Sequence, residues 1–587
     1  MMPPQRPAPF HRRSRGFALA LLGAITAITG TAITSPARAD VCSDSSGASN
    51  CVTMWNTDFI GFTDLTSAPL VNGPPEVANQ MAMFGTAMYN AVNNATGALY
   101  RPTAYSASAP TSADPAAAAL AAGYGTLMGI FAPVTNPVGG TPVAGNPLSG
   151  VAGVTNANTF GGLLATLPGP QGSATASASI VSKLNADYQA AYSKLDLSNP
   201  AVQAGLALGQ SQALATLTGR LNDNALAAIT NGLLPNVPAG LGTPGVYTPP
   251  SVAGGRPEMF PLWGTVTPWS MTSSTQFAPP PPPAIGSQAY AASVLATECL
   301  GARTALSAST ATACAAAKTA AQAGAPAYTN TSALSAGTIW NATNFGTLNT
   351  QGGATPTNSQ LALFWNDPGT TLQPPGHWLQ ITDTVATSTG LGLLDSARVT
   401  AQVGVAEADA AITAWQSKYT YNLWRPVAAI RDCADAWNAG FTTCDGTWSS
   451  VIATPPHPDY LAGHPTFSYA AATVLENFFG GGTSFCSASD PYTNSGSPVA
   501  AITLCYNDFL DAASDGSDSR VYGGIHTDIS TAASALTGTL VADNLITTQF
   551  DPIPEPASLA LLAAGLAVLA PLRRRVSKPG HDRATRQ

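Results

Sequence analysis

The sequence WQSKYTYNLWRP, residues 415–426, closes the longest apolar-periodic segment of the chain, which predicts a helix from residue 388 to residue 421. At 3.6 residues per turn, a helix that continued to Pro426 would place Lys418 and Arg425 on one face, with Trp415 one turn earlier. These cations stand out because only 9% of the residues are charged. The stretch therefore predicts a helix that delivers two cations to one place.

A second segment, LAGHPTFSYAAATVL at residues 461–475, is typical of a helix that begins at a Gly-His pair. Proline is favoured in the first turn of a helix, and Pro465 follows this pair directly. The first backbone N–H groups of a helix have no acceptor within it, so they gather around Gly463 and His464. Because such groups favour negative charge, the sequence predicts a site for an oxyanion here.

A third segment, SRVYGGIH at residues 519–526, adds Arg520 and, across two glycines, His526. Three cations, two imidazoles and a helix N-terminus together suit a tetrahedral or trigonal-bipyramidal oxyanion. Taken singly, each of these residues has an ordinary interpretation as an exposed lysine, an ion-pairing arginine, a turn glycine or a capped histidine. Their joint spacing is what favours a site.

This spacing resembles the signature shared by vanadium-dependent haloperoxidases and type 2 phosphatidic acid phosphatases. The signature runs Lys-x6-Arg-Pro, then Gly-His, then Ser-Arg-x5-His, and the three blocks occur here in that order. The resemblance implies that the equatorial oxygens of vanadate, or of a phosphoryl group, are held by Lys418, Arg425 and Arg520. It also implies an amide donor at Gly463, an acid/base at His464 and an apical ligand or nucleophile at His526.

Two further residues bear on the substrate. Trp415 matches a tryptophan in the pocket wall of haloperoxidases. His457, seven residues before His464, falls where algal bromoperoxidases carry a histidine and chloroperoxidases a phenylalanine. The resemblance thus implies a haloperoxidase that oxidises bromide or iodide with hydrogen peroxide for a small organic acceptor, with Trp415 and His457 at the halide. An exposed loop histidine is the ordinary alternative for His457.

Two other functions stay open. Phosphoryl transfer also passes through five-coordinate phosphorus, so an acid phosphatase could use His526 as nucleophile and His464 as acid. An inherited but inactive pocket in a secreted surface or matrix protein is the other alternative.

The chain departs from the family at Ala462, where the family has a serine. The hydrogen bond of that serine hydroxyl, which would contribute about 0.5–1.5 kcal/mol to oxyanion binding, is absent. It also has Ser530 four residues after His526, where the family has an acidic residue, with Asp528 two after instead. This displacement counts against the phosphatase and leaves the tautomer of His526 undetermined.

Both ends of the chain carry targeting signals. Residues 1–39 combine arginines, an apolar run and a final Ala-Arg-Ala, which predict a secretory signal peptide. Pro-Glu-Pro at 554–556, an apolar run and three arginines resemble a PEP-CTERM sorting signal, assigned here to residues 552–576, before a basic tail at 577–587. These signals predict export to the periplasm, cell envelope or extracellular matrix, with membrane sorting in bacteria that make exopolysaccharide.

Composition agrees with export. The net charge of −8 argues against a nucleic-acid partner, since a phosphate backbone would be repelled. An even number of cysteines in an exported chain favours disulfides. The sequence has no Cys-x2-Cys motif of the kind that binds zinc. Pairing of sequence neighbours is the simplest of many connectivities: Cys42/Cys51, Cys299/Cys314, Cys433/Cys444 and Cys486/Cys505.

The rest of the chain predicts an all-α helical bundle with long irregular loops, which is also the fold that the resemblance implies. We divide it into an N-terminal helical half, residues 40–360, and a C-terminal half, residues 361–551, that carries the oxyanion site. Periodic or alanine-rich segments predict helices within residues 77–97, 114–129, 173–195, 200–229 and 284–322. Long loops are predicted at 133–159 and 233–283. A homodimer is an expectation that the sequence leaves open.

Overall fold

The computed structural model describes residues 41–42, 49–66, 72–107, 112–136, 140–167, 174–232, 243–248, 258–303, 305–306, 308–322, 356–432 and 444–553. The predicted signal peptide and nearly all of the sorting tail lie outside these residues. The described residues all belong to one compact unit, Asp40–Gln587. Within them, no helix combines the length and the apolar character that crossing a membrane would need.

Most of the described residues are helical and few are in strands, which confirms the all-α prediction. The helices of the first half are α1 (Cys51–Thr66), α2 (Pro74–Ala95), α3 (Pro115–Phe131), α4 (Phe160–Leu164), α5 (Ala174–Tyr192), α6 (Pro200–Arg220), α7 (Ala225–Gly232), α8 (Gln288–Leu300) and α9 (Ala308–Gln322). Two short 3-10 turns, η1 (Asn156–Asn158) and η2 (Trp263–Thr265), lie in the long predicted loops.

The second half contributes seven helices and four short strands among the described residues. The helices are α10 (Asn358–Phe364), α11 (Gln373–Ser388), α12 (Leu393–Tyr421), α13 (Pro426–Arg431), α14 (Gly463–Phe479), α15 (Phe509–Tyr522) and α16 (Asp528–Thr548). The strands form two antiparallel pairs, β1 (Phe485–Ala488) with β4 (Thr503–Tyr506) and β2 (Tyr492–Asn494) with β3 (Ser497–Val499).

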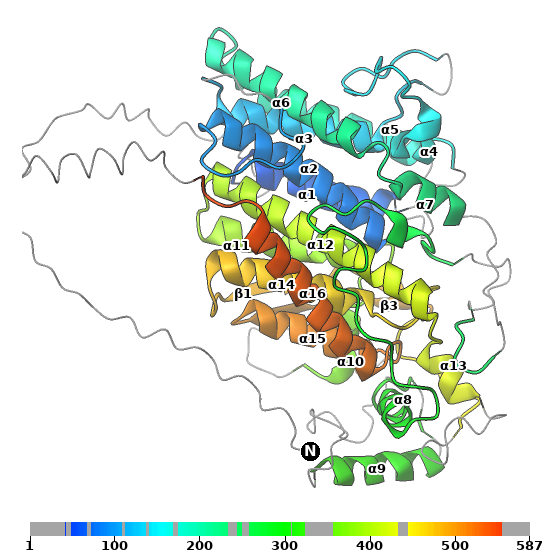
Figure 1. Cartoon of the computed structure of the whole chain (residues 1–587). Coiled ribbons are helices and arrows are strands. Elements are labelled where there is room, and N and C mark those ends of the chain that lie inside the picture. The colour runs from blue at the N-terminus through cyan, green and yellow to red at the C-terminus, as the bar shows by residue number, and fades with distance from the viewer. Residues whose placement is uncertain are drawn as a thin grey trace, which may run out of the picture. The chain divides into compact units, whose positions relative to one another are not determined.

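Helix α12 is the central element of the bundle. It packs along α2 on one side and against α14 and α16 on the other, so the two predicted halves share one core (Figure 1). Small residues permit this contact, since a Cβ atom at Gly404 would lie 3.0 Å from the backbone nitrogen of Ala82. The alanine- and glycine-rich composition therefore serves close approach between helices.

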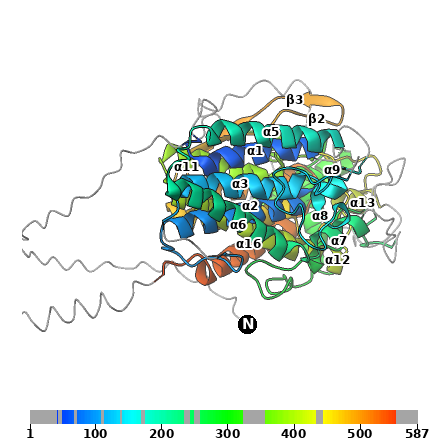
Figure 2. The ribbon, with the colours of Figure 1, turned by 90° about the horizontal axis from the view of Figure 1, so that it is seen from above.

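The α3–α6 pair follows the same rule. These helices run side by side in the view from above (Figure 2). A Cβ atom at Gly209 of α6 would lie 2.3 Å from the carbonyl oxygen of Ala118 in α3, so only glycine fits there. The start of α3 is capped by Asp114, whose side chain accepts from the Ala117 N–H, with Pro115 in the first turn.

Two long helices predicted from sequence are each broken in two. The segment 200–229 splits into α6 and α7 because Asn224 has a φ of 74° and Asp223 accepts from the Ala225 N–H. The segment 284–322 splits into α8 and α9, and Gly301, which follows α8, packs against the backbone of Gly524. Local capping and tertiary contact decide these breaks, and periodicity does not report them.

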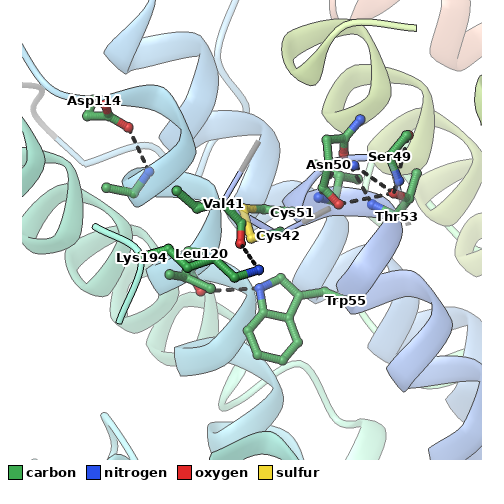
Figure 3. The surroundings of a disulfide bond; sticks show 12 residues. Val41, Cys42, Ser49, Asn50, Cys51, Thr53, Trp55, Asp114, Leu120 and Lys194 are labelled. Atoms are coloured by element: carbon green, nitrogen blue, oxygen red, sulfur yellow. Dashed lines mark hydrogen bonds between the residues drawn. A yellow bond between two sulfur atoms is a disulfide. The ribbon is translucent and has the colours of Figure 1, made fainter. Parts of the chain in front are cut away.

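Three of the four expected disulfides are present: Cys42–Cys51, Cys299–Cys314 and Cys486–Cys505. Cys444 is also disulfide-bonded, whereas Cys433 lies outside the described residues. Around the first disulfide, Lys194 donates to the Val41 carbonyl at 2.9 Å and the Trp55 indole donates to the Leu120 carbonyl of α3 at 3.2 Å (Figure 3). These bonds join the beginning of the described chain to the helices beside it.

Candidate functional site

A cavity of about 250 Å³ collects most of the residues that the sequence singled out. Its walls include Trp415, His457, Gly463, His464, Arg520 and His526. Further lining residues come from the start of α2, from residues 366–369 and from the turn between β2 and β3. Lys418 and Arg425 are not among the lining residues, but Arg425 contacts His457, Ile525 and His526, which are. The predicted site residues are therefore brought together, while their roles stay predictions.

Arg425 reaches the site by a different route from the one predicted. Helix α12 ends at Tyr421, because Asn422 turns left-handed with a φ of 47°. The chain then runs extended, with the Trp424 N–H donating to the Gly245 carbonyl at 3.0 Å, and Arg425 occupies the position just before α13. The prediction that Lys418 and Arg425 share one helical face was wrong. Spacing in sequence cannot reveal a left-handed residue that ends a helix early.

Lys418 holds the loop that carries the histidines. Its ammonium group donates to the carbonyl oxygens of Pro458 (2.9 Å), Asp459 (3.4 Å) and Leu461. These bonds use its three N–H donors, so contact with an oxyanion would require it to give up at least one of them. Burial, and then the charge of Arg425, hold the pKa of Lys418 well below its usual range.

Arg425 bridges two imidazoles. Its Nη2 group donates to Nδ1 of His457 at 2.8 Å, and its Nη1 group donates to Nε2 of His526 at 3.0 Å and to the Ile525 carbonyl at 2.7 Å. Its Nε group donates to the His457 carbonyl at 2.6 Å. A guanidinium group can only donate, so both ring nitrogens that it faces carry a lone pair.

Asp459 is the site residue that sequence analysis missed. Its buried carboxylate accepts from Nδ1 of His526 through one oxygen and from the Thr527 hydroxyl at 2.9 Å through the other. This pairing assigns the proton of His526 to Nδ1 and leaves Nε2 as the basic atom. Burial raises the pKa of Asp459 to about 6, although Arg425 and Lys418 oppose that shift. The tautomer that the sequence left undetermined is thereby fixed.

The residues after His526 do not supply this carboxylate. The Ser530 hydroxyl donates to the Asp459 carbonyl at 3.0 Å, and Asp528 bonds to the Ser293 hydroxyl of α8. Ser530 and Asp459 thus belong to the same network. The sequence predicted that His526 lacks the carboxylate that orients it in a phosphatase. That prediction was wrong, because Asp459 supplies this carboxylate from the loop before α14. A lone acidic residue five positions before His464 was the only sequence signal.

His464 and Arg520 form the other end of the site. His464 Nε2 lies 3.2 Å from the Asn366 carbonyl, which can only accept, and 3.3 Å from Nη1 of Arg520, which can only donate, so the two contacts favour opposite tautomers. Burial, and then the charge of Arg520, hold the pKa of His464 well below its usual range, so the ring is neutral. Arg520 donates to the Ser519 hydroxyl at 2.9 Å and to the Trp365 carbonyl, and burial lowers its pKa to about 10.

Trp415 and His457 lie next to each other in the cavity wall, with ring centroids 5.2 Å apart. Trp415 donates to the Met259 carbonyl at 3.2 Å and lies against Gly463, where a Cβ atom would be 3.3 Å from its ring. The Lys418 ammonium nitrogen lies 5.5 Å from the centroid of the Trp415 ring. His457 is buried rather than an exposed loop histidine, which was the ordinary alternative.

The charges of the site suit an oxyanion. Lys418, Arg425 and Arg520 are all buried, and two carboxylates lie near them: Asp459 bonds to His526, and Asp367 lines the cavity and acts by its charge on Arg520. Burial lowers the pKa of all three cations, so an anion beside them would offset that cost. Among the described residues, no group of three His, Cys, Asp or Glu side chains is placed to hold a metal cation. The donor set therefore fits vanadate or phosphate.

Comparisons with known proteins agree with this geometry. A family model described as the VCPO second helical-bundle domain matches residues 398–553, the part of the chain that contains the site. A vanadium chloroperoxidase of Curvularia inaequalis is 28% identical over 142 residues, which cover 22% of this chain and 23% of that protein. The match thus spans less than a quarter of the length of the chloroperoxidase.

A solved structure described as the first bacterial vanadium-dependent iodoperoxidase has a similar fold. The likeness covers 86% of this chain and 97% of that one, with a TM-score of 0.57 and 20% sequence identity. At this identity the likeness concerns the fold. It extends over both predicted halves, whereas the family model concerns the second half only.

Proposed function

We propose that this chain, which belongs to the superfamily of vanadium-dependent haloperoxidases and type 2 phosphatidic acid phosphatases, is a vanadate-dependent haloperoxidase. It would oxidise halide with hydrogen peroxide and pass the halogen to a small organic acceptor. The observation that carries the proposal is a cavity lined by His464, His526 and Arg520, with two further buried cations, Lys418 and Arg425, next to its lining residues. The similarity to a chloroperoxidase supports this choice within the superfamily.

In this proposal the residues of the chain divide the work. Lys418, Arg425 and Arg520 hold the oxyanion by charge, and the Gly463 N–H at the start of α14 donates to one oxygen. Bound vanadate would supply a Lewis acid that activates peroxide without a change of metal oxidation state. His526, fixed by Asp459, would present Nε2 to the oxyanion once that atom gives up its hydrogen bond from Arg425. His464 takes up and returns a proton.

A histidine-dependent phosphatase is the second candidate, and the Asp459–His526 pair favours it. A carboxylate that fixes the tautomer of a histidine would equally prepare Nε2 to attack phosphorus. His464 would then protonate the leaving oxygen. The same residues therefore serve both reactions, and the choice requires a chemical assay.

Bromide or iodide is the halide that we propose. His457 supports this choice, because a buried imidazole held by Arg425 adds a polar group to the wall beside Trp415. We also propose that the protein is exported through the signal at residues 1–39 and sorted by its carboxyl-terminal segment. Fractionation of cells that express the full chain tests export, since the protein should be absent from the cytoplasm and residues 1–39 should be missing.

A paired assay tests the function. The mature protein is dialysed with or without vanadate, then given bromide, peroxide and a dye, and in parallel an aryl phosphate. The haloperoxidase brominates the dye only when vanadate is present. A phosphatase hydrolyses the ester and is inhibited by vanadate, an outcome that would overturn the proposal. A protein that retains no vanadate and performs neither reaction has an inactive pocket.

A further inference from the structure

Met259 belongs to the wall of the active-site cavity, together with His457, Gly463 and His464. Its sulfur atom lies against Gly73, where a Cβ atom would be 3.4 Å away, and Gly73 lines the same cavity. The sulfur therefore lies between the loop at residue 259 and the start of α2, on the wall of the chamber that contains the two basic imidazoles.

The main chain of Met259 is tightly held. Its N–H donates to the Pro456 carbonyl at 2.8 Å, and its carbonyl accepts from the Trp415 indole at 3.2 Å and from the Tyr419 hydroxyl at 2.6 Å. These bonds attach the residue to the loop before His457 and to the end of α12. The main chain of Met259 thus stays at the cavity wall.

We propose that Met259 is a self-modification site, which the hypohalous acid produced in this cavity oxidises to the sulfoxide. The inference rests on the proposed function, which supplies that oxidant from halide and peroxide. In the step the sulfur loses two electrons and gains the oxygen of hypobromous acid. Bromine leaves as bromide, and the proton passes to water.

Concentration favours this site over other methionines. One molecule confined in a cavity of about 250 Å³ corresponds to a concentration of roughly 7 M, far above any level reached in bulk solution. Met271 and Met54 are similarly buried, with 7% of each residue exposed against 9% for Met259, but neither lines this cavity. Exposure to solvent therefore does not distinguish the three residues, and exposure to the product does.

Oxidation would change the chamber. The sulfoxide is polar and bulkier than the thioether, and it would stand in the wall next to Trp415 and Gly73. We therefore expect the activity to decline with the number of turnovers rather than with time. Reduction of the sulfoxide would restore it, so the residue would limit the output of an enzyme that releases a damaging oxidant.

Peptide mass spectrometry after turnover tests the inference. In the vanadate-loaded protein given bromide and peroxide, sulfoxide at Met259 should exceed that at Met271 by at least about 10-fold, whereas peroxide alone should give no such preference. Dye bromination without preferential oxidation of Met259 would overturn the inference and leave the proposed function intact. If no dye is brominated, the proposed function fails. Hypobromite added to protein without vanadate is the control, and it should give no such preference for Met259, because the oxidant then arrives from the solvent.

Two variants test the consequence. Met259→Leu keeps an apolar side chain and removes the sulfur, and Met271→Leu is its matched control. Counted in turnovers and normalised to the initial rate of each variant, Met259→Leu should last at least about 3-fold longer than wild type, and Met271→Leu should not. Equal turnover numbers for Met259→Leu and wild type would show that oxidation of Met259 does not limit the enzyme.

Discussion

Two buried regions of this protein contain ionisable side chains, and they differ in what surrounds them. In the site, the cations Lys418 and Arg425 donate to backbone carbonyls and imidazoles beside a cavity of about 250 Å³. Along the central helices, Glu76 of α2 and Glu407 of α12 are equally buried, and Asp383 of α11 is partly buried. One oxygen of Glu76, one of Asp383 and both of Glu407 have no hydrogen-bond partner among the described residues.

The two regions respond to burial in opposite ways. Desolvation raises the pKa of Glu76 to about 8 and the pKa values of Asp383 and Glu407 well above the usual range, so these carboxyl groups are neutral near pH 7. A guanidinium group cannot escape its charge in this way. Arg425 and Arg520 therefore keep charges that cost stability, and binding of an anion is the physical reason to keep them. Burial alone does not identify a functional residue.

Removal of one site cation should change vanadate binding more than any other variant described below. It tests whether the buried cations are kept for anion binding. We expect Lys418→Met to raise the dissociation constant for vanadate at least about 100-fold, which corresponds to about 3 kcal/mol for the loss of a buried charge at the oxyanion. Equilibrium dialysis measures it, and circular dichroism checks the fold because Lys418 holds three carbonyls. Lys183→Met, at a lysine whose side chain is 54% exposed, is the control. Unchanged vanadate affinity in Lys418→Met would remove the functional reason for the cluster.

The carboxyl region should respond in stability instead. Because the pKa of Glu76 is about 8 when folded and about 4.5 when unfolded, the folded protein binds more protons between these pH values. The free energy of unfolding therefore falls as pH rises from 4.5 to 8 and levels off above. Glu76→Gln keeps an acceptor for Gln80 and removes the proton cost, so we expect a gain of about 3 kcal/mol at pH 7 and a weaker pH dependence.

Urea unfolding at several pH values measures this change. Asp395→Asn alters a carboxylate that is 43% exposed and pairs with Arg398, and it should change stability by less than about 0.5 kcal/mol. Vanadate affinity should stay the same in both variants, which separates the two regions. A loss of stability at pH 7 in Glu76→Gln would mean that Glu76 is ionised and stabilising.

The sequence predicted the site better than it predicted the helices around it. The residues of the three sequence blocks meet in space because their spacing resembles that of a known family, and this resemblance carries tertiary information that periodicity lacks. Periodicity alone missed the ends and breaks of helices. It did not report the turn at Asn422, which takes Arg425 off helix α12, or the break at Asp223, because each depends on one residue's backbone angle or hydrogen bond.

Asp459 shows the other limit of sequence reasoning. Its partner His526 is 67 residues away, so no local pattern joins them. The family pattern led us to expect the carboxylate four residues after His526, in the chain that follows the histidine. The fold instead places the loop of residues 457–464 beside Thr527 and Ser530, and three hydrogen bonds then fix the pair. A role that depends on two loops meeting is visible only after folding.

Substitution of Asp459 should weaken vanadate binding less than removal of a cation does, because this carboxylate acts through His526 in the cationic region. An asparagine amide at 459 can donate to Nδ1 of His526 and move the ring proton to Nε2, which would then lack the lone pair that holds the oxyanion. We expect Asp459→Asn to weaken vanadate binding about 10- to 100-fold, and Asp459→Glu to recover part of it. Nitrogen NMR of the His526 ring reports the tautomer directly, and a purely structural role would not move it. Asp528→Asn is the control, because Asp528 bonds to Ser293 instead.

Substitution of His457 should have the smallest effect on vanadate binding or halide preference. The result shows which role this residue has in the cationic region. Its Nδ1 atom accepts from Arg425 at 2.8 Å, and its ring also lies beside Trp415, so it could position the arginine or face the halide.

Two variants separate these roles. His457→Phe removes both functions, whereas His457→Asn keeps an oxygen that can accept from Arg425. If the histidine selects halide, both variants should shift the ratio of chloride to bromide oxidation a few-fold, at unchanged vanadate affinity. If it positions Arg425, only His457→Phe should weaken vanadate binding, by about 1 kcal/mol or 5-fold, because a neutral hydrogen bond is worth that much. Halide competition and vanadate dialysis on the two variants separate these roles, and no change in either measurement would exclude both.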